Sequence, residues 1–257
     1  MATMQIAGPA GHCEEDMTNP KVSTPLSIPG HSGAPRTLSA YPTVTGASVM
    51  GICYDGGVVV AADIGAYFGK TLRFENCPRI RKVNQFTLMA VSGDYADFQY
   101  LEKLTEAKVI DEDRYHDGFQ LKPKSLHSWL SRVLYNRRNK FDPLWTNIIV
   151  AGMQDGKPYL GYVDKLGSAF ETHVYATGFG TYLGLGHLAE AYEKKKGKLS
   201  KQEAIEVVKG VLRVLYYRDT MSHPKFQIAV CSAEGISIEG PFMIDSDWLC
   251  ATLSGTY

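Results

Sequence analysis

Apolar residues form continuous runs in some parts of this chain and recur at helical spacing in others. The order of these two patterns predicts the order of the secondary-structure elements. Continuous apolar runs come first, at 44–53 and at 57–63 (GVVVAAD), and residues 54–56 (YDG) between them form a hairpin turn signal. Runs of this kind are typical of strands that are covered on both faces of a sheet. Two further strands are predicted at 80–83 and 86–91.

Helical spacing replaces these runs in the next part of the chain. Apolar residues three positions apart predict a helix over 95–110, and a stripe at i, i+3, i+4, i+7 and i+8 predicts a second over 126–134, before Pro143. Ser200 and Glu203 form a capping box, so a later helix is expected to begin there. The other predicted elements are strands at 147–153, 159–163 and 169–176, a helix near 182–192, and strands at 226–231 and 236–239. This grouping, with strands buried on both faces, predicts an α+β fold arranged as a four-layer αββα sandwich.

Residues 1–40 show neither pattern and are rich in Gly, Pro, Ser and Thr. Such composition is typical of a disordered or removable leader. The whole chain has 257 residues, which suits one sizeable domain. We therefore expect an N-terminal propeptide at 1–40 and a single domain at 41–257.

The balance of charges narrows the class of partner, and the use of cysteine indicates the cellular compartment. Lys and Arg together number 27, as do Asp and Glu, so the net charge of zero argues against nucleic acid or an anionic membrane as the main partner. No apolar run reaches the length of a membrane span. Five scattered cysteines without a CxxC pair favour reduced thiols in a protein of the cytoplasm and nucleus (Cys13, Cys53, Cys77, Cys231 and Cys250). Histidines are also dispersed, so no metal or cofactor is expected.

Five segments of the domain resemble the beta subunits of the eukaryotic 20S proteasome, a threonine-peptidase family. They are VTGASVMGICYDGGVVVAAD, SGDYADFQYL, NRRNKFDPLW, ATGFG and VLYYRD. The segments follow the family's order and spacing from about Tyr41 to about Trp248. The resemblance implies the N-terminal nucleophile (Ntn) hydrolase fold, with two sheets between helical layers, and this agrees with the periodic pattern.

The resemblance also implies a catalytic site, and this chain departs from it at the nucleophile. In active members the first threonine of the mature chain attacks the peptide carbonyl, with its own α-amino group as the base. Aligned on GVVVAAD, that threonine falls on Ala47, the family's lysine on Arg79 and its aspartate on Asp63. The side chain of Ala47 has no oxygen and Arg79 stays protonated, so we expect no catalytic residue in this chain. We expect Asp63 and Arg79 to form an ion pair.

Other positions of the family's site are partly kept. Its oxyanion glycine falls on Gly93, the two residues that flank the amino terminus fall on Asp219 and Ser222, and a further serine is replaced by Phe179. Without a hydroxyl at Ala47 the leader cannot be removed by self-cleavage. The resemblance implies trimming further upstream, near residues 38–41.

Several other side chains have ordinary structural interpretations. Cys53 is favoured as a buried strand thiol over a nucleophile. Strand alternation is expected to point Ser48 away from the face of Ala47. His127 and Ser128 are expected at the surface or rim of their helix rather than as a catalytic pair.

Aromatic and arginine residues in the second predicted helix and beyond suggest contacts with other chains. Tyr135, Arg137, Arg138 and Trp145 are the candidate interface residues, because these residue types are enriched at interfaces. The resemblance implies as partners the other beta subunits of the same ring and of the facing ring, the alpha-ring subunits, and assembly chaperones.

The sequence therefore favours a non-catalytic structural subunit that supports beta-ring assembly and encloses the proteolytic chamber. Two alternatives stay open at this point. One is an active Ntn amidohydrolase with an unrecognised nucleophile, and the other is a free-standing peptide-binding protein.

Overall fold

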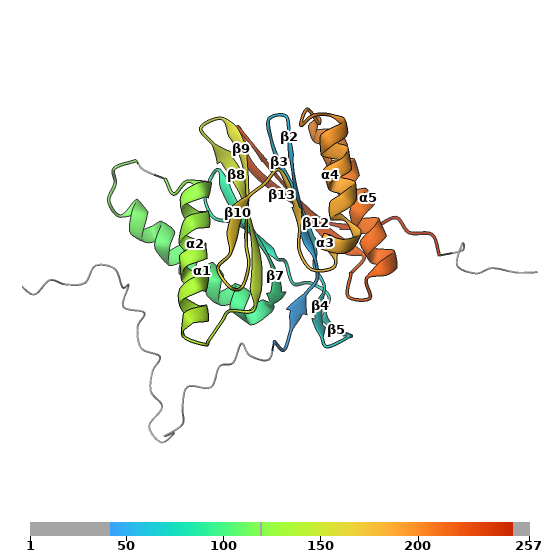
Figure 1. Ribbon diagram of the computed structural model, residues 1–257, viewed down its shortest axis with the longest axis horizontal. Helices are drawn as coiled ribbons and strands as arrows, with labels where there is room; N and C mark the ends of the chain where they lie inside the picture. Colours follow the sequence, from blue (N-terminus) through green and yellow to red (C-terminus); the bar gives the residue numbers. More distant parts are fainter. Residues whose placement is uncertain (1–41, 119, 249–257) are drawn as a thin grey trace, which may run out of the picture. The chain divides into compact units, whose positions relative to one another are not determined.

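Three clusters of buried apolar residues hold four layers of secondary structure together (Figure 1). The structure is a computed structural model that describes residues 42–118 and 120–248; the expected leader, Cys13 and Cys250 lie outside the described residues. One cluster joins two helices to an eight-stranded sheet, the second lies between that sheet and a five-stranded sheet, and the third joins the five-stranded sheet to the remaining helices. The expected α+β sandwich with αββα layers is thus confirmed.

The eight-stranded sheet is antiparallel, in the order β10-β9-β8-β7-β1-β4-β5, and β6 pairs with β7 beside this path. Its strands are β1 Thr45–Gly46, β4 Ala66–Phe68, β5 Thr71–Phe74, β6 Ile80–Lys82, β7 Thr87–Asp94, β8 Thr146–Gln154, β9 Lys157–Val163 and β10 Ala169–Glu171. In the described part of the chain β1 is the strand that joins β4 and β5 to the rest of this sheet.

The five-stranded sheet has the order β11-β2-β3-β12-β13 and is also antiparallel. Its strands are β2 Val49–Tyr54, β3 Gly57–Asp63, β11 Val174–Ala176, β12 Lys225–Ser232 and β13 Gly235–Met243. Every residue of β3 is buried, because a sheet covers one of its faces and α5 (Lys201–Arg218) the other. The continuous apolar run GVVVAAD indicated this environment correctly.

The other helices are α1 Tyr95–Asp113, α2 Pro123–Asn139, α3 Gly180–Leu183 and α4 Leu185–Lys194. The capping box predicted before α5 is present: the Ser200 hydroxyl accepts a hydrogen bond from the Glu203 amide, and the Ser200 amide donates to the Glu203 carboxylate. In α2 the predicted stripe buries its leucines against the eight-stranded sheet, while Trp129 and Val133 pack at the edge of the same cluster.

Two of the predicted strands are in fact two strands each, in different sheets. The run 44–53 divides into β1 and β2, because the chain crosses from the eight-stranded to the five-stranded sheet at Ala47 and Ser48. The run 169–176 divides in the same way into β10 and β11. An apolar run records burial but not which sheet supplies the hydrogen bonds, so the pattern did not predict either crossing.

Two more differences have local causes. The predicted helix at 182–192 is broken at Gly184, where an added Cβ would lie 2.5 Å from a methyl of Val211 on α5, so close packing requires glycine here. The hairpin of β4 and β5 was not predicted. All four residues of β5 are exposed, so burial leaves no periodic pattern in that strand.

Asp94 links the start of α1 to the segment that leads into β1. Its Oδ1 accepts hydrogen bonds from the amides of Ala96 and Asp97 at 2.9 and 3.0 Å, which caps the helix. Its Oδ2 accepts a hydrogen bond from the amide of Thr43 at 3.0 Å. A single buried carboxylate therefore holds two segments far apart in sequence.

Replacing this carboxylate should destabilise the domain. We expect Asp94→Ala to lower the free energy of unfolding by about 1–2 kcal/mol, because the helix loses its cap. Asp94→Asn keeps one oxygen acceptor and should lose less. Urea unfolding of the purified chains measures both values, and an equal loss in the two variants would contradict the capping role.

Candidate functional site

The residues just before Ala47 are part of the eight-stranded sheet rather than a free end. Thr45 pairs with Asp94 of β7 on one side and with Tyr67 of β4 on the other. Gly46 pairs in the same way with both strands, and the Val44 carbonyl accepts a hydrogen bond from the amide of Tyr95 at 2.8 Å. The segment upstream of Ala47 therefore has a structural role in this fold.

Arg79 determines where the chain crosses between the sheets. Its guanidinium forms an ion pair with Asp63 and donates hydrogen bonds to the carbonyls of Ala47 at 2.7 Å and Ser48 at 3.1 Å. It also donates to the carbonyl of Val91 in β7 at 3.2 Å. The expected pairing of Asp63 with Arg79 is thus present, and both side chains are almost fully buried.

Asp63 depends on its donors to remain ionised. Burial raises the pKa of Asp63, while the charge of Arg79 and hydrogen bonds from Arg79 and the backbone of His223 act in the opposite direction. The His223 amide donates to Oδ2 of Asp63 at 2.8 Å, so each carboxylate oxygen has a partner.

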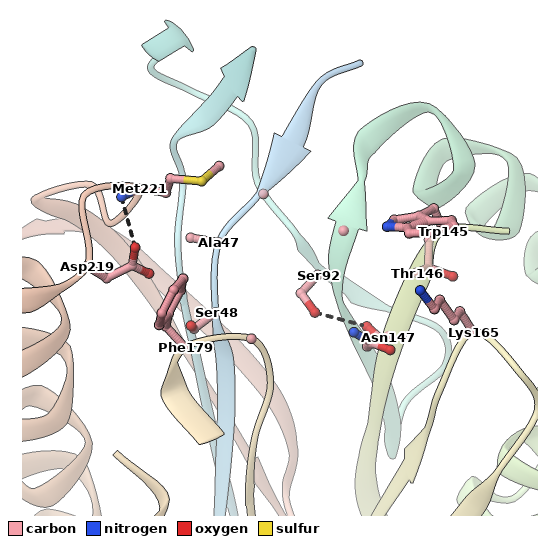
Figure 2. Close-up of a pocket in the computed structure, with 13 residues that line it drawn as sticks. Ala47, Ser48, Ser92, Trp145, Thr146, Asn147, Lys165, Phe179, Asp219 and Met221 are labelled. Atoms are coloured by element: carbon pink, nitrogen blue, oxygen red, sulfur yellow. Dashed lines mark hydrogen bonds between the residues drawn. The ribbon is translucent and has the colours of Figure 1, made fainter. Parts of the chain in front are cut away.

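Ala47 lies at the edge of a pocket of about 230 Å³ that opens between the ends of the two sheets (Figure 2). Phe179, Asp219 and Met221 line one wall. The other wall is formed by residues of β7, of β8 and the position just before it, and of the loop after β9, namely Ser92, Gly93, Trp145, Thr146, Asn147 and Lys165. The pocket thus collects most of the positions that the sequence assigned to the site.

Several of these positions are held by local contacts. Gly93 has a φ of +103°, and a Cβ there would overlap the carbonyl of Trp145, so this position requires glycine. Asp219 is buried and accepts a hydrogen bond from the amide of Met221 at 2.9 Å. Phe179 remains largely exposed at the rim. Ser222 is absent from the pocket lining; its amide donates to the carbonyl of Asp219.

Ser48 lines the same pocket as Ala47, contrary to the expectation from strand alternation. Alternation does not apply, because the strand is interrupted between Gly46 and Val49. The Ser48 hydroxyl accepts a hydrogen bond from the amide of Gly180 at 2.9 Å and is buried. It therefore fixes the start of α3 to the crossing segment.

Three side-chain hydroxyls line the pocket, those of Ser48, Ser92 and Thr146, and Oγ1 of Thr146 is buried without a hydrogen-bond partner among the described residues. The hydroxyl of Ser92 donates to the carbonyl of Asn147, and Lys165 and Asp219 are the titratable groups of the lining. Cys53 lies in β2 outside this lining, and burial raises the pKa of its thiol to about 12. A protonated, enclosed thiol is a poor nucleophile.

His127 is buried, which corrects the expectation that it lies at the surface or rim; Ser128 is exposed as expected. The Nε2 of His127 lies 2.9 Å from the carbonyl of Tyr162, and the Nδ1 of the same ring lies 2.9 Å from the hydroxyl of Tyr159. The imidazole packs over Gly161, where an added Cβ would lie 2.8 Å from the ring. The glycine on the facing strand thus makes room for a polar ring, which the helix pattern alone did not reveal.

The four candidate interface residues lie in different surroundings. Tyr135 and Arg138 are exposed on α2, with the guanidinium 5.5 Å from the ring. Arg137 forms an ion pair with Asp142 at 2.7 Å. Trp145 belongs to the pocket instead, where the ammonium of Lys165 lies 3.5 Å from its ring centroid.

The described residues contain no group of three or more His, Cys, Asp or Glu side chains that could hold a metal ion. None of their helices has the length and apolar character needed to cross a membrane.

This chain is similar to known proteins over most of its length. The family profile described as "Proteasome subunit" matches residues 43–231. Proteasome subunit beta type-4 of Xenopus laevis is 46% identical over 88% of this chain and 92% of its own length. Proteins of the same name from Drosophila melanogaster (40% identity, 84% of this chain, 81% of their own length) and Arabidopsis thaliana (38%, 83% and 85%) are also similar.

Gly46→Ala tests the packing around Arg79. An added Cβ would overlap Cδ of the buried Arg79 side chain and lie 2.6 Å from its Nε, so we expect a loss of roughly 1–3 kcal/mol in the free energy of unfolding from overpacking. Gly210→Ala in α5 is the matched control, because a Cβ there meets nothing within 4 Å and should stabilise the helix by up to about 1 kcal/mol. Chemical denaturation measures both, and a neutral Gly46→Ala would contradict the close contact.

Proposed function

The chain belongs to the proteasome subunit family, and from this premise we propose that it is a non-catalytic beta subunit of the 20S core particle. It occupies the ring position of the type-4 beta subunits that it resembles, the seventh beta position. There it supports assembly of the beta ring and encloses the chamber in which proteins are degraded.

One observation carries the proposal: the position of the family's nucleophile holds Ala47, whose methyl group has no lone pair to attack a carbonyl. The surrounding geometry adds to this argument. Arg79 replaces the family's lysine, and its guanidinium is committed to Asp63 and to three carbonyls. It cannot exchange a proton at physiological pH. This argues against the alternative of an active amidohydrolase, since both the nucleophile and the lysine of the family's site are replaced.

The propeptide is proposed to be trimmed upstream of Tyr41, near residues 38–41, which leaves the domain at 41–257. The pairing of β1 supports this proposal, because a chain that began at Ala47 would lose β1 and with it the hydrogen bonds that hold β4 and β5 to the sheet. The missing hydroxyl at Ala47 supports it independently.

The proposed partners are the neighbouring beta subunits of the same ring, subunits of the facing beta ring, and the alpha ring, in the cytoplasm and nucleus. Assembly chaperones are proposed as transient partners. Tyr135 and Arg138 on α2 are the most exposed of the candidate contact residues. Together they present an aromatic ring and a cation, and both residue types are enriched at interface hot spots.

Native mass spectrometry of the purified complex tests this function. We expect the chain in a particle with alpha and other beta subunits, and an intact mass that corresponds to a first residue upstream of Thr43. An intact mass that corresponds to a chain beginning at Ala47 would contradict the proposal that β1 is retained. Migration of the chain as a monomer would instead favour a free-standing peptide-binding protein.

Ala47→Thr separates the missing nucleophile from the rest of the site. We expect peptide hydrolysis by this subunit and its labelling by a threonine-directed covalent probe to stay at background, because Arg79 cannot replace the lysine. Labelled active subunits in the same particle are the internal control. Labelling of this chain in the variant would show that Arg79 is compatible with catalysis.

A further inference from the structure

We propose that the pocket beside Ala47 binds the C-terminal carboxylate of short peptides. The inference rests on the proposed function, since it is inside a proteolytic chamber that the pocket would meet such peptides. It goes beyond that function, because it assigns to a subunit without a nucleophile a binding site for the products of others.

The size of the pocket suits the end of a peptide. Its volume of about 230 Å³ is smaller than the roughly 300–1,000 Å³ typical of sites for drug-sized ligands. Its rim carries the apolar groups of Phe179, Met221 and Trp145, which can cover an apolar terminal side chain. A small pocket with an apolar rim favours one terminal residue over a longer extended segment.

Lys165 supplies a positive charge that no carboxylate of the described residues neutralises. Its ammonium lies over the ring of Trp145, and none of the ion pairs found in the described ranges includes it. The cation–π contact holds the ammonium at the pocket wall while its N–H groups remain available to a ligand. A charge-assisted hydrogen bond to a carboxylate is the strongest interaction that such a group can add.

Asn147 adds a second donor on the same wall (Figure 2). Its side-chain oxygen accepts a hydrogen bond from the hydroxyl of Tyr162 at 3.3 Å, which leaves the amide NH₂ group for the pocket. Two donors from Asn147 and Lys165 on one wall suit the two oxygens of a carboxylate.

The charge on the opposite wall of the pocket determines the orientation in which a peptide would bind. Asp219 carries the negative charge there, and the amide of Met221 satisfies one of its oxygens. Like charges repel, so a carboxylate is favoured beside Lys165 and disfavoured beside Asp219. The peptide would therefore place its terminus on the wall of β8 and extend toward Phe179 and Met221.

Methyl NMR of the assembled particle can test the proposal, because Met221 lines the pocket and its methyl group reports on occupancy. The particle carries ¹³C-methyl methionine in this subunit, and its active threonines are blocked by a covalent inhibitor. The probes are N-acetyl-Ala-Leu with a free carboxylate and the same dipeptide with a C-terminal amide. Met153, at the far end of β8, is the reference methyl.

We expect the acid to shift the Met221 resonance saturably and the amide to bind about tenfold more weakly, as the loss of one charge-assisted contact implies. Lys165→Met should reduce acid binding to the level of the amide. Lys209→Met on α5, outside the pocket lining, should leave it unchanged.

Equal binding of acid and amide, no shift of Met221, or unchanged acid binding in Lys165→Met would each overturn the proposal. If Lys165→Met does not assemble, the comparison of acid with amide on the unmodified particle decides alone. Failure of the chain to enter a particle at all would be seen before any peptide is added, and would count against the proposed function instead.

Discussion

The buried guanidinium of Arg79 is the interaction on which the arrangement of this site depends. It joins three chain segments through one carboxylate and three carbonyls: Asp63 in β3, Ala47 and Ser48 at the crossing, and Val91 in β7. A buried ion pair is weak evidence of net stabilisation, because desolvation offsets the attraction. Its clearer effect is on specificity: the guanidinium bonds three segments at once, although its buried Nε has no partner among the described residues, so few alternative positions of the backbone would keep all of these bonds.

This constraint extends to both sheets. With the carbonyls of Ala47 and Ser48 bound to Arg79, the chain leaves the eight-stranded sheet after Gly46 and enters the five-stranded sheet at Val49. On this path β1 lies between β4 and β7. The same path brings the hydroxyl of Ser48 to the start of α3. The pocket is the space that remains between these fixed segments, so its shape does not depend on a nucleophile.

Sequence reasoning succeeded where a residue's role is local and failed where it depends on distant contacts. The strand at 57–63 and the cap at Ser200 follow from neighbouring residues, and both are as predicted. The crossing at Ala47 depends on a guanidinium 32 positions away, and the burial of His127 depends on a glycine in another strand. The family resemblance identified most of the site positions, because it carries long-range information that periodicity lacks. The same resemblance did not show that Ser48 shares the pocket.

Three of the polar groups around Ala47 are bonded to the protein's own backbone. Reactive sites keep polar groups poised for a substrate, often at a cost in stability. Here Ser48, Asp63 and Asp219 all accept hydrogen bonds from backbone amides of their own chain. These three polar groups therefore serve the fold, whereas Asn147 and Lys165, which we propose to bind a carboxylate, lie on the wall of the pocket opposite Asp219. The walls of the pocket do not require a hydroxyl at Ala47, because Arg79 and Ser48 hold the crossing segment and the start of α3 in place.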